Sequence, residues 1–242
     1  MGSDFIGYFK NNLYLWVKLF MQMSLLVSLC LAIFRLEWLT VFLVSMIMVL
    51  TLIPLRLNTQ LNIVIPLEIE ILSLAIIYAS LYLGEIGNYY EKYWWWDILL
   101  HSGSGFLFGV LGFLLIWILN DKPKSYLGLS PFFMALVSFS FSITMGVAWE
   151  IFEFTLDQSL GLNMQKSGLV DTMWDLIVVC FGALFVSGFG YSYLKFGYRS
   201  FASQWFEDFV ENNPDIFNEN KNTTKIPGTR IQSNYGSTAK RK

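Results

Sequence analysis

Repeated apolar runs, each close to the length of a membrane-spanning helix, constrain the fold of this 242-residue chain more than any other feature. About 20 apolar residues in an α-helix cross the roughly 30 Å hydrocarbon core of a bilayer. Backbone amides in that core must be bonded within the protein, so only helices and closed barrels span it. The runs lack the alternation of strands, which favours helices. Charged residues make up only 14% of the chain, against about 25% in soluble domains.

The runs predict an all-α, polytopic membrane helix bundle with about six transmembrane helices within residues 1–200. The six expected spans are 13–34, 36–54, 66–83, 94–119, 131–156 and 172–196. The first two are separated by so few residues that we expect a tight antiparallel hairpin. Residues 201–211 place aromatic side chains at helical spacing beside acids, which predicts an amphipathic interfacial helix. Residues 212–242 are polar and basic and are expected to form a disordered cytoplasmic tail, a candidate docking segment for a protein partner.

The distribution of lysine and arginine predicts the orientation of the bundle. The side shared by the two termini holds Lys10, Arg56, Lys122, Lys124, Lys195 and Arg199. The opposite side holds only Arg35, Lys92 and Lys166. Because cytoplasmic loops are richer in basic residues, we expect a multi-pass protein of the cell (inner, cytoplasmic) membrane with both termini cytoplasmic. The net charge of −2 gives no indication of a nucleic-acid partner.

Ionisable residues gather at the outer ends of the later spans. Such residues are costly within a bilayer, so each is a functional hypothesis. They lie three or four residues apart, which places neighbours on one helix face: Asp97 and His101, then Glu150, Glu153 and Asp157, then Asp171 and Asp175. Glu85 ends the span before them. No lysine or arginine lies near them within these spans, and the nearest basic residues, Lys92 and Lys166, fall in connecting segments.

Closely spaced carboxylates cannot all stay ionised in a low-dielectric site unless protons are shared, water enters or a cation neutralises them. Carboxylates with one imidazole suit Zn²⁺, Mn²⁺ or Fe²⁺, whereas oxygen ligands alone suit Mg²⁺. The predicted ligands of a divalent metal ion are His101, Glu150, Glu153 and Asp175. Four further acids are expected to hold these ligands in place: Asp97, Asp171, Asp157 and Glu85. A structural hydrogen-bond network around His101 is the competing interpretation, and Asp157 and Asp171 equally fit solvated helix ends.

The same residues resemble the YjdF-like family of small multi-pass inner-membrane proteins of bacteria and archaea. The resemblance runs through Leu83-Gly-Glu85, Tyr90, Trp96-Asp97-Ile-Leu-Leu-His101-Ser-Gly-Ser-Gly105, Gly146-Val-Ala-Trp149-Glu150-Ile-Phe-Glu153 and Asp171-Thr-Met-Trp-Asp175. It covers roughly the last four spans. Since the activity of that family is undefined, the resemblance implies a fold and the positions of a site, but no reaction. The family pattern often has a second acid after Asp175-Leu-Ile, where this chain has Val178-Val179.

Three functions are compatible with these features. The first is a metal-dependent enzyme acting on a lipid-linked or interfacial substrate, with the cation activating a water molecule. The second is a cation or proton transporter, because carboxylates facing a bundle interior also mark ion pathways. The third is a non-catalytic scaffold or accessory subunit that docks through its tail. The catalytic residues of an enzyme are not identified by any motif in the sequence.

Overall fold

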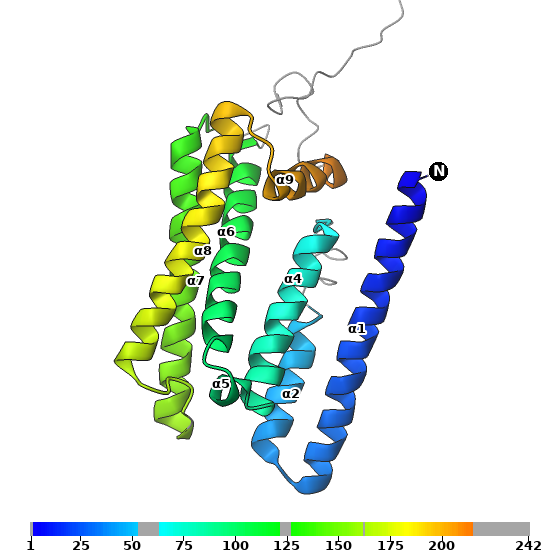
Figure 1. Ribbon diagram of the computed structural model, residues 1–242, viewed down its shortest axis with the longest axis vertical. Coiled ribbons are helices and arrows are strands. Elements are labelled where there is room, and N and C mark those ends of the chain that lie inside the picture. The colour runs from blue at the N-terminus through cyan, green and yellow to red at the C-terminus, as the bar shows by residue number, and fades with distance from the viewer. Residues whose placement is uncertain (1, 53–62, 122–126, 162, 215–242) are drawn as a thin grey trace, which may run out of the picture.

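The computed structural model describes residues 2–52, 63–121, 127–161 and 163–214, and every regular element among them is helical (Figure 1). The all-α prediction is therefore confirmed. The elements are α1 (Gly2–Arg35), α2 (Trp38–Leu50), α4 (Leu67–Ile77), η1 (Tyr78–Ile86), α5 (Tyr89–Lys92), α6 (Trp96–Asp121), α7 (Pro131–Leu160), α8 (Leu169–Phe196) and α9 (Phe201–Asn212). The segment η1 continues α4 as a wider π-helix. Most of the tail predicted for 212–242 lies outside the described residues.

Five helical stretches are long and apolar enough to cross a membrane: Tyr14–Arg35, Leu67–Ile86, Trp96–Asn120, Pro131–Ser159 and Leu169–Phe196. The remaining apolar helix, α2, has 13 residues, or about 20 Å at 1.5 Å per residue. Part of the span predicted at 36–54 falls outside the described residues. Large apolar side chains also cover the outer faces of the spans; Phe20 is 70% exposed and Phe181 is 68% exposed. Such surfaces fit a lipid environment, so the structure agrees with a polytopic bundle of about six spans.

Helices α6, α7 and α8 pack together as the central unit of the bundle. A side chain at Gly182 of α8 would place its Cβ 2.4 Å from the backbone oxygen of Ser102 on α6. A Cβ at Gly105 of α6 would lie 2.6 Å from the backbone oxygen of Val179 on α8. From α7, the Ser142 hydroxyl donates a 2.7 Å hydrogen bond to the Gly105 carbonyl. Small residues and cross-helix hydroxyl contacts are the usual means of packing membrane helices closely.

A second layer formed by α1, α2, α4 and η1 lies beside this unit (Figure 1). The hairpin of α1 and α2 is held to η1 by a buried cluster of Leu25, Val44, Ile47 and Leu81. In the other half of the layer, Lys18 of α1 lies 3.6 Å from Glu70 of α4, and the Tyr14 hydroxyl donates to the same carboxylate. Because α4 and η1 also contact α6, this layer is anchored to the central unit.

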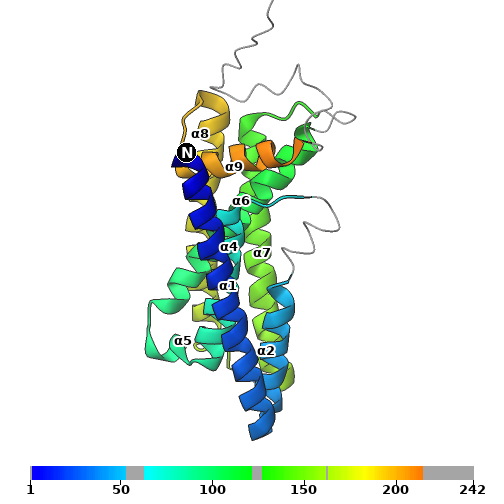
Figure 2. The same cartoon turned by 90° about the vertical axis from the view of Figure 1, so that its right-hand side faces the viewer.

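Helix α9 lies across the end of the bundle where α1 begins (Figure 2). Its Ser200 and Ser203 form a reciprocal capping box that starts the helix. Its buried side chains Phe206 and Val210 join the core cluster that contains Phe113 of α6. The helix coincides with the segment expected to be amphipathic, and its apolar face packs against the bundle. Its position at a membrane surface stays a prediction.

Candidate metal centre

The acidic residues gather at the end of the bundle opposite α9, where α6 and α8 begin and α7 ends (Figure 1). Asp97 lies in the first turn of α6 and Asp171 in the first turn of α8. Negative charge in the first turn of a helix is stabilised by the exposed backbone N–H groups and the helix dipole. His101 and Asp175 each lie one turn further along these two helices. The close approach of α6 to α8 thus brings both pairs together.

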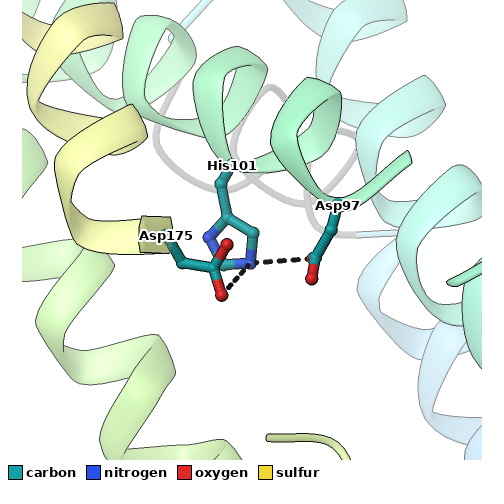
Figure 3. A group of neighbouring side chains, drawn as sticks. All are labelled: Asp97, His101 and Asp175. Carbon is teal, nitrogen blue, oxygen red and sulfur yellow. Dashed lines mark ion pairs between the residues drawn. The ribbon is translucent and has the colours of Figure 1, made fainter. Parts of the chain in front are cut away.

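His101 lies between two carboxylates that approach the same ring nitrogen (Figure 3). Its Nε2 is 3.3 Å from Asp97 Oδ1 and 3.8 Å from Asp175 Oδ2. One ligand atom from each of the three residues lies within 4.8 Å of the others. His101 is 7% exposed and Asp175 is 5% exposed, so water screens this group only weakly.

Glu150 of α7 approaches the imidazole from its other nitrogen. Its Oε1 lies 4.0 Å from His101 Nδ1, and the side chain is 4% exposed. Neither carboxylate oxygen has a hydrogen-bond partner among the described residues, although Gln165 and Thr172 lie beside it. The Gln165 amide instead donates to the Thr172 hydroxyl at 2.8 Å. A buried, unpaired carboxylate is unusual because it loses its hydration without compensation.

The other predicted site residues have separate partners. Glu153 is buried and accepts a 2.8 Å hydrogen bond from the Trp149 indole. Asp157 accepts hydrogen bonds from the backbone N–H groups of Met164 and Gln165, at 2.8 and 2.9 Å, and so shapes the connection between α7 and α8. Asp171 and Glu85 are partly buried at the edge of the group. The residues whose ligand atoms meet are therefore Asp97, His101 and Asp175, with Glu150 and Glu153 around them.

Two residues near the centre were not among the predicted site residues. Lys166, in the connection between α7 and α8, places its Nζ 3.7 Å from Asp97 Oδ2 and 4.5 Å from the centre of the Tyr90 ring. Tyr90 of α5 shares a 2.9 Å hydrogen bond with Ser80. Burial, together with the nearby acids, raises the pKa of the Tyr90 phenol, which stays protonated. The sequence signal that could have identified Lys166 was its position as a single lysine shortly after the acidic end of α7.

A family model described as "Predicted membrane protein (DUF2238)" matches residues 17–196 of this chain. The chain belongs to that family. The match confirms the resemblance to small multi-pass membrane proteins, and it spans every predicted site residue from Glu85 to Asp175. An uncharacterized protein of Thermotoga maritima is 30% identical over 142 residues, which cover 59% of this chain and 68% of that relative. No solved structure gives a significant match.

In this DUF2238 protein, the donor types and spacing of Asp97, His101 and Asp175 fit a small divalent cation. Two ligands about 2.1 Å from a tetrahedral zinc ion lie roughly 3.4 Å apart. The 3.3 and 3.8 Å separations between His101 Nε2 and the two carboxylates are close to that value. All three ligand atoms lie within 4.8 Å of one another, so a tetrahedral ion would require the two carboxylates to move closer together by up to about 1.4 Å.

Proposed function

We propose that this membrane protein binds a divalent metal ion through Asp97, His101 and Asp175 and uses it to hydrolyse an ester of a lipid-linked substrate. Under the orientation predicted from the basic residues, the site faces the outer side of the cell membrane. The depth of the site, at the ends of three spanning helices, favours a substrate whose reactive group lies at the lipid headgroups.

The observation that carries this proposal is the buried carboxylate of Glu150, whose oxygens have no hydrogen-bond partner among the described residues. A histidine that binds metal through one ring nitrogen almost always donates the other N–H to a carboxylate, a carbonyl or water. With a cation at His101 Nε2, the Nδ1–H would face Glu150 Oε1, now 4.0 Å away. A small movement would complete a carboxylate–histidine–metal chain. The metal thus explains both the two acids at one nitrogen and the single acid at the other.

The ligand set also suits hydrolysis. One imidazole with two carboxylates favours Zn²⁺, Mn²⁺ or Fe²⁺ over Mg²⁺. A cation held by these three protein ligands would leave a coordination position for water and would make a proton of that water easier to remove. In hydrolysis the water oxygen bonds to the acyl carbon or phosphorus and the ester bond breaks. The proton that water releases passes through a neighbouring carboxylate to the departing oxygen.

Metal analysis of purified protein tests the proposal. After loading with Zn²⁺, Mn²⁺ or Fe²⁺ and removal of free ions, wild-type protein should retain one of them stoichiometrically. His101→Ala should lose it while keeping its helical fold. Ser102→Ala is the matched control, because the Ser102 hydroxyl donates to the Leu99 carbonyl of its own helix and is not one of the three proposed ligands. Retention of metal by His101→Ala, or no retention by wild type with any of the three ions, would refute the site.

Cation or proton transport is a second candidate, favoured by one observation. The group formed by Tyr14, Lys18 and Glu70 provides ionisable side chains inside the opposite half of the bundle. Ionisable groups in both halves of the bundle are what a relay across the membrane requires, and these three are partly buried. Ion flux into proteoliposomes that is lost in Glu70→Gln would support transport. Flux that this substitution leaves unchanged would exclude the group of Tyr14, Lys18 and Glu70 from the ion pathway.

A further inference from the structure

An apolar cavity of about 280 Å³ lies directly beside the candidate metal centre. This is near the lower end of the roughly 300–1,000 Å³ range of small-ligand sites. His101 forms part of its wall, and most of the remaining wall is apolar, including Ile76, Leu81, Phe108, Met145 and Phe152. We call this space the His101 cavity.

The cavity results from the way three helical segments meet. The continuous helix of α4 and η1 packs on α6, and α7 packs on α6 as well, so that α6 lies between them (Figure 1). Trp149 of α7 reaches across to the buried cluster that contains Leu25, Val44 and Leu81. Most of the cavity wall belongs to helices long and apolar enough to span a membrane. Phe152 in this wall is 36% exposed, so the wall reaches the outer surface of the bundle.

Most polar atoms in the wall are already bonded within the protein. The hydroxyls of Ser80 and Tyr90 bond to each other at 2.9 Å. The Ser104 hydroxyl donates to the backbone oxygen of His101 at 3.0 Å, and the Trp149 indole donates to Glu153 at 2.8 Å. Ordered water needs two to four polar partners, so this cavity favours hydrocarbon over water. His101 lines the cavity and also contacts Asp97 and Asp175, so it joins the cavity to the acidic group.

We propose that the His101 cavity binds one hydrocarbon chain of a membrane lipid and places the ester of that lipid at the Asp97–His101–Asp175 centre. An amphiphile with one apolar chain and one polar, oxygen-rich end matches a cavity that is apolar along its wall and borders a candidate cation site at His101. The bilayer around the spans supplies such molecules. The reaction rests on the proposed hydrolase, whereas binding of the chain rests only on the cavity.

Photolabelling of the full-length protein tests the occupant. The probe is a lysophosphatidylglycerol whose single acyl chain carries a diazirine, and the labelled residues are located by peptide mass spectrometry. We expect labels on cavity residues such as Phe108 and Met145, and competition by unlabelled lysophosphatidylglycerol. Filling the cavity with Ala148→Trp or Ser104→Leu should reduce this labelling about tenfold, the effect of excluding about two CH₂ groups. Val147→Trp is the control, since Val147 is exposed beside Ala148 and does not line the cavity.

The outcomes separate the two proposals. Labels confined to lipid-facing residues, or cavity labels that survive competition and both filling substitutions, would overturn the lipid site. Because wild-type competition is measured independently, a filling variant that misfolds does not remove the test. Metal content is measured on the same samples. Cavity labelling without bound metal would support the lipid site and reject the hydrolase. Bound metal without cavity labelling would support the metal centre and reject the lipid site.

Discussion

Replacing Glu150 with leucine should have opposite effects on the metal-free and the metal-bound protein. The Glu150 side chain is 4% exposed, and neither of its oxygens has a hydrogen-bond partner among the described residues. In metal-free protein we therefore expect this side chain to destabilise the fold. In metal-bound protein the same carboxylate would orient His101 through Nδ1, and its loss would weaken binding.

The structure sets the size of both effects. Leaving a buried polar group unpaired costs about 1–3 kcal/mol, so Glu150→Leu should raise the free energy of unfolding of chelated protein by a similar amount. Removing the partner of a metal-bound histidine typically weakens metal binding by about 10- to 100-fold. That loss corresponds to roughly 1.4–2.7 kcal/mol. The substitution should thus stabilise the protein in chelator and reduce the further stabilisation that metal provides.

The matched control is Glu153→Leu, one turn further along α7. Glu153 is also buried but accepts the 2.8 Å hydrogen bond of the Trp149 indole, so its removal should destabilise chelated protein. Thermal unfolding in detergent, with chelator and with a titrated metal, measures both variants against wild type. Equal destabilisation of chelated protein by the two substitutions would refute the reasoning, as would unchanged metal affinity in Glu150→Leu.

Three further predictions follow from the packing, the charges and the topology. Gly182→Ala should lower the free energy of unfolding by about 1–3 kcal/mol, because its Cβ would meet the Ser102 carbonyl at 2.4 Å, whereas Gly188→Ala, with nothing within 4 Å, should not. Lys166→Met should strengthen metal binding about two- to fivefold in equilibrium titrations, because it removes the ammonium group 3.7 Å from Asp97. Lys92→Met is the control, and weaker metal binding by Lys166→Met would contradict this. A cysteine at Ser167, in protein lacking Cys30 and Cys180, should react with an impermeant reagent only from outside, and labelling only from the cytoplasm would reverse the orientation.

The helical class and the position of the acids at one end of the spans could be predicted because both follow from the order of apolar and polar residues along each span. The i, i+4 spacing also placed Asp97 and His101 on one face, where the structure has them 3.3 Å apart. The π-helical turns of η1 were not predicted, because i to i+5 bonding has no distinct hydropathy period. For α9, helical spacing predicted an apolar face, but that pattern cannot tell a lipid surface from the buried core that contains Phe206.

The grouping of the acids could not be predicted, because it depends on how each helix is rotated about its axis. Asp97 was expected to support the ligands, yet it lies nearer to His101 Nε2 than Asp175 does. The rotation of α8 against α6 is set by the Gly105 and Gly182 contacts, which hydropathy does not reveal. Lys166 reaches Asp97 because hydrogen bonds to Asp157 fold back the α7–α8 connection. Contacts of this kind are long-range and leave no local pattern.

Two explanations account for the charge at this end of the bundle: a bound cation and shared protons. A proton on each ring nitrogen of His101 would also lower the net negative charge, with Nε2–H between Asp97 and Asp175 and Nδ1–H facing Glu150. Lys166 compensates Asp97 from the edge, with its Nζ 3.7 Å from Asp97 Oδ2. A cation among Asp97, His101 and Asp175 would neutralise the centre and orient the Nδ1–H toward Glu150. Because both explanations leave an N–H facing Glu150, retention of metal by purified protein and its loss in His101→Ala distinguish them.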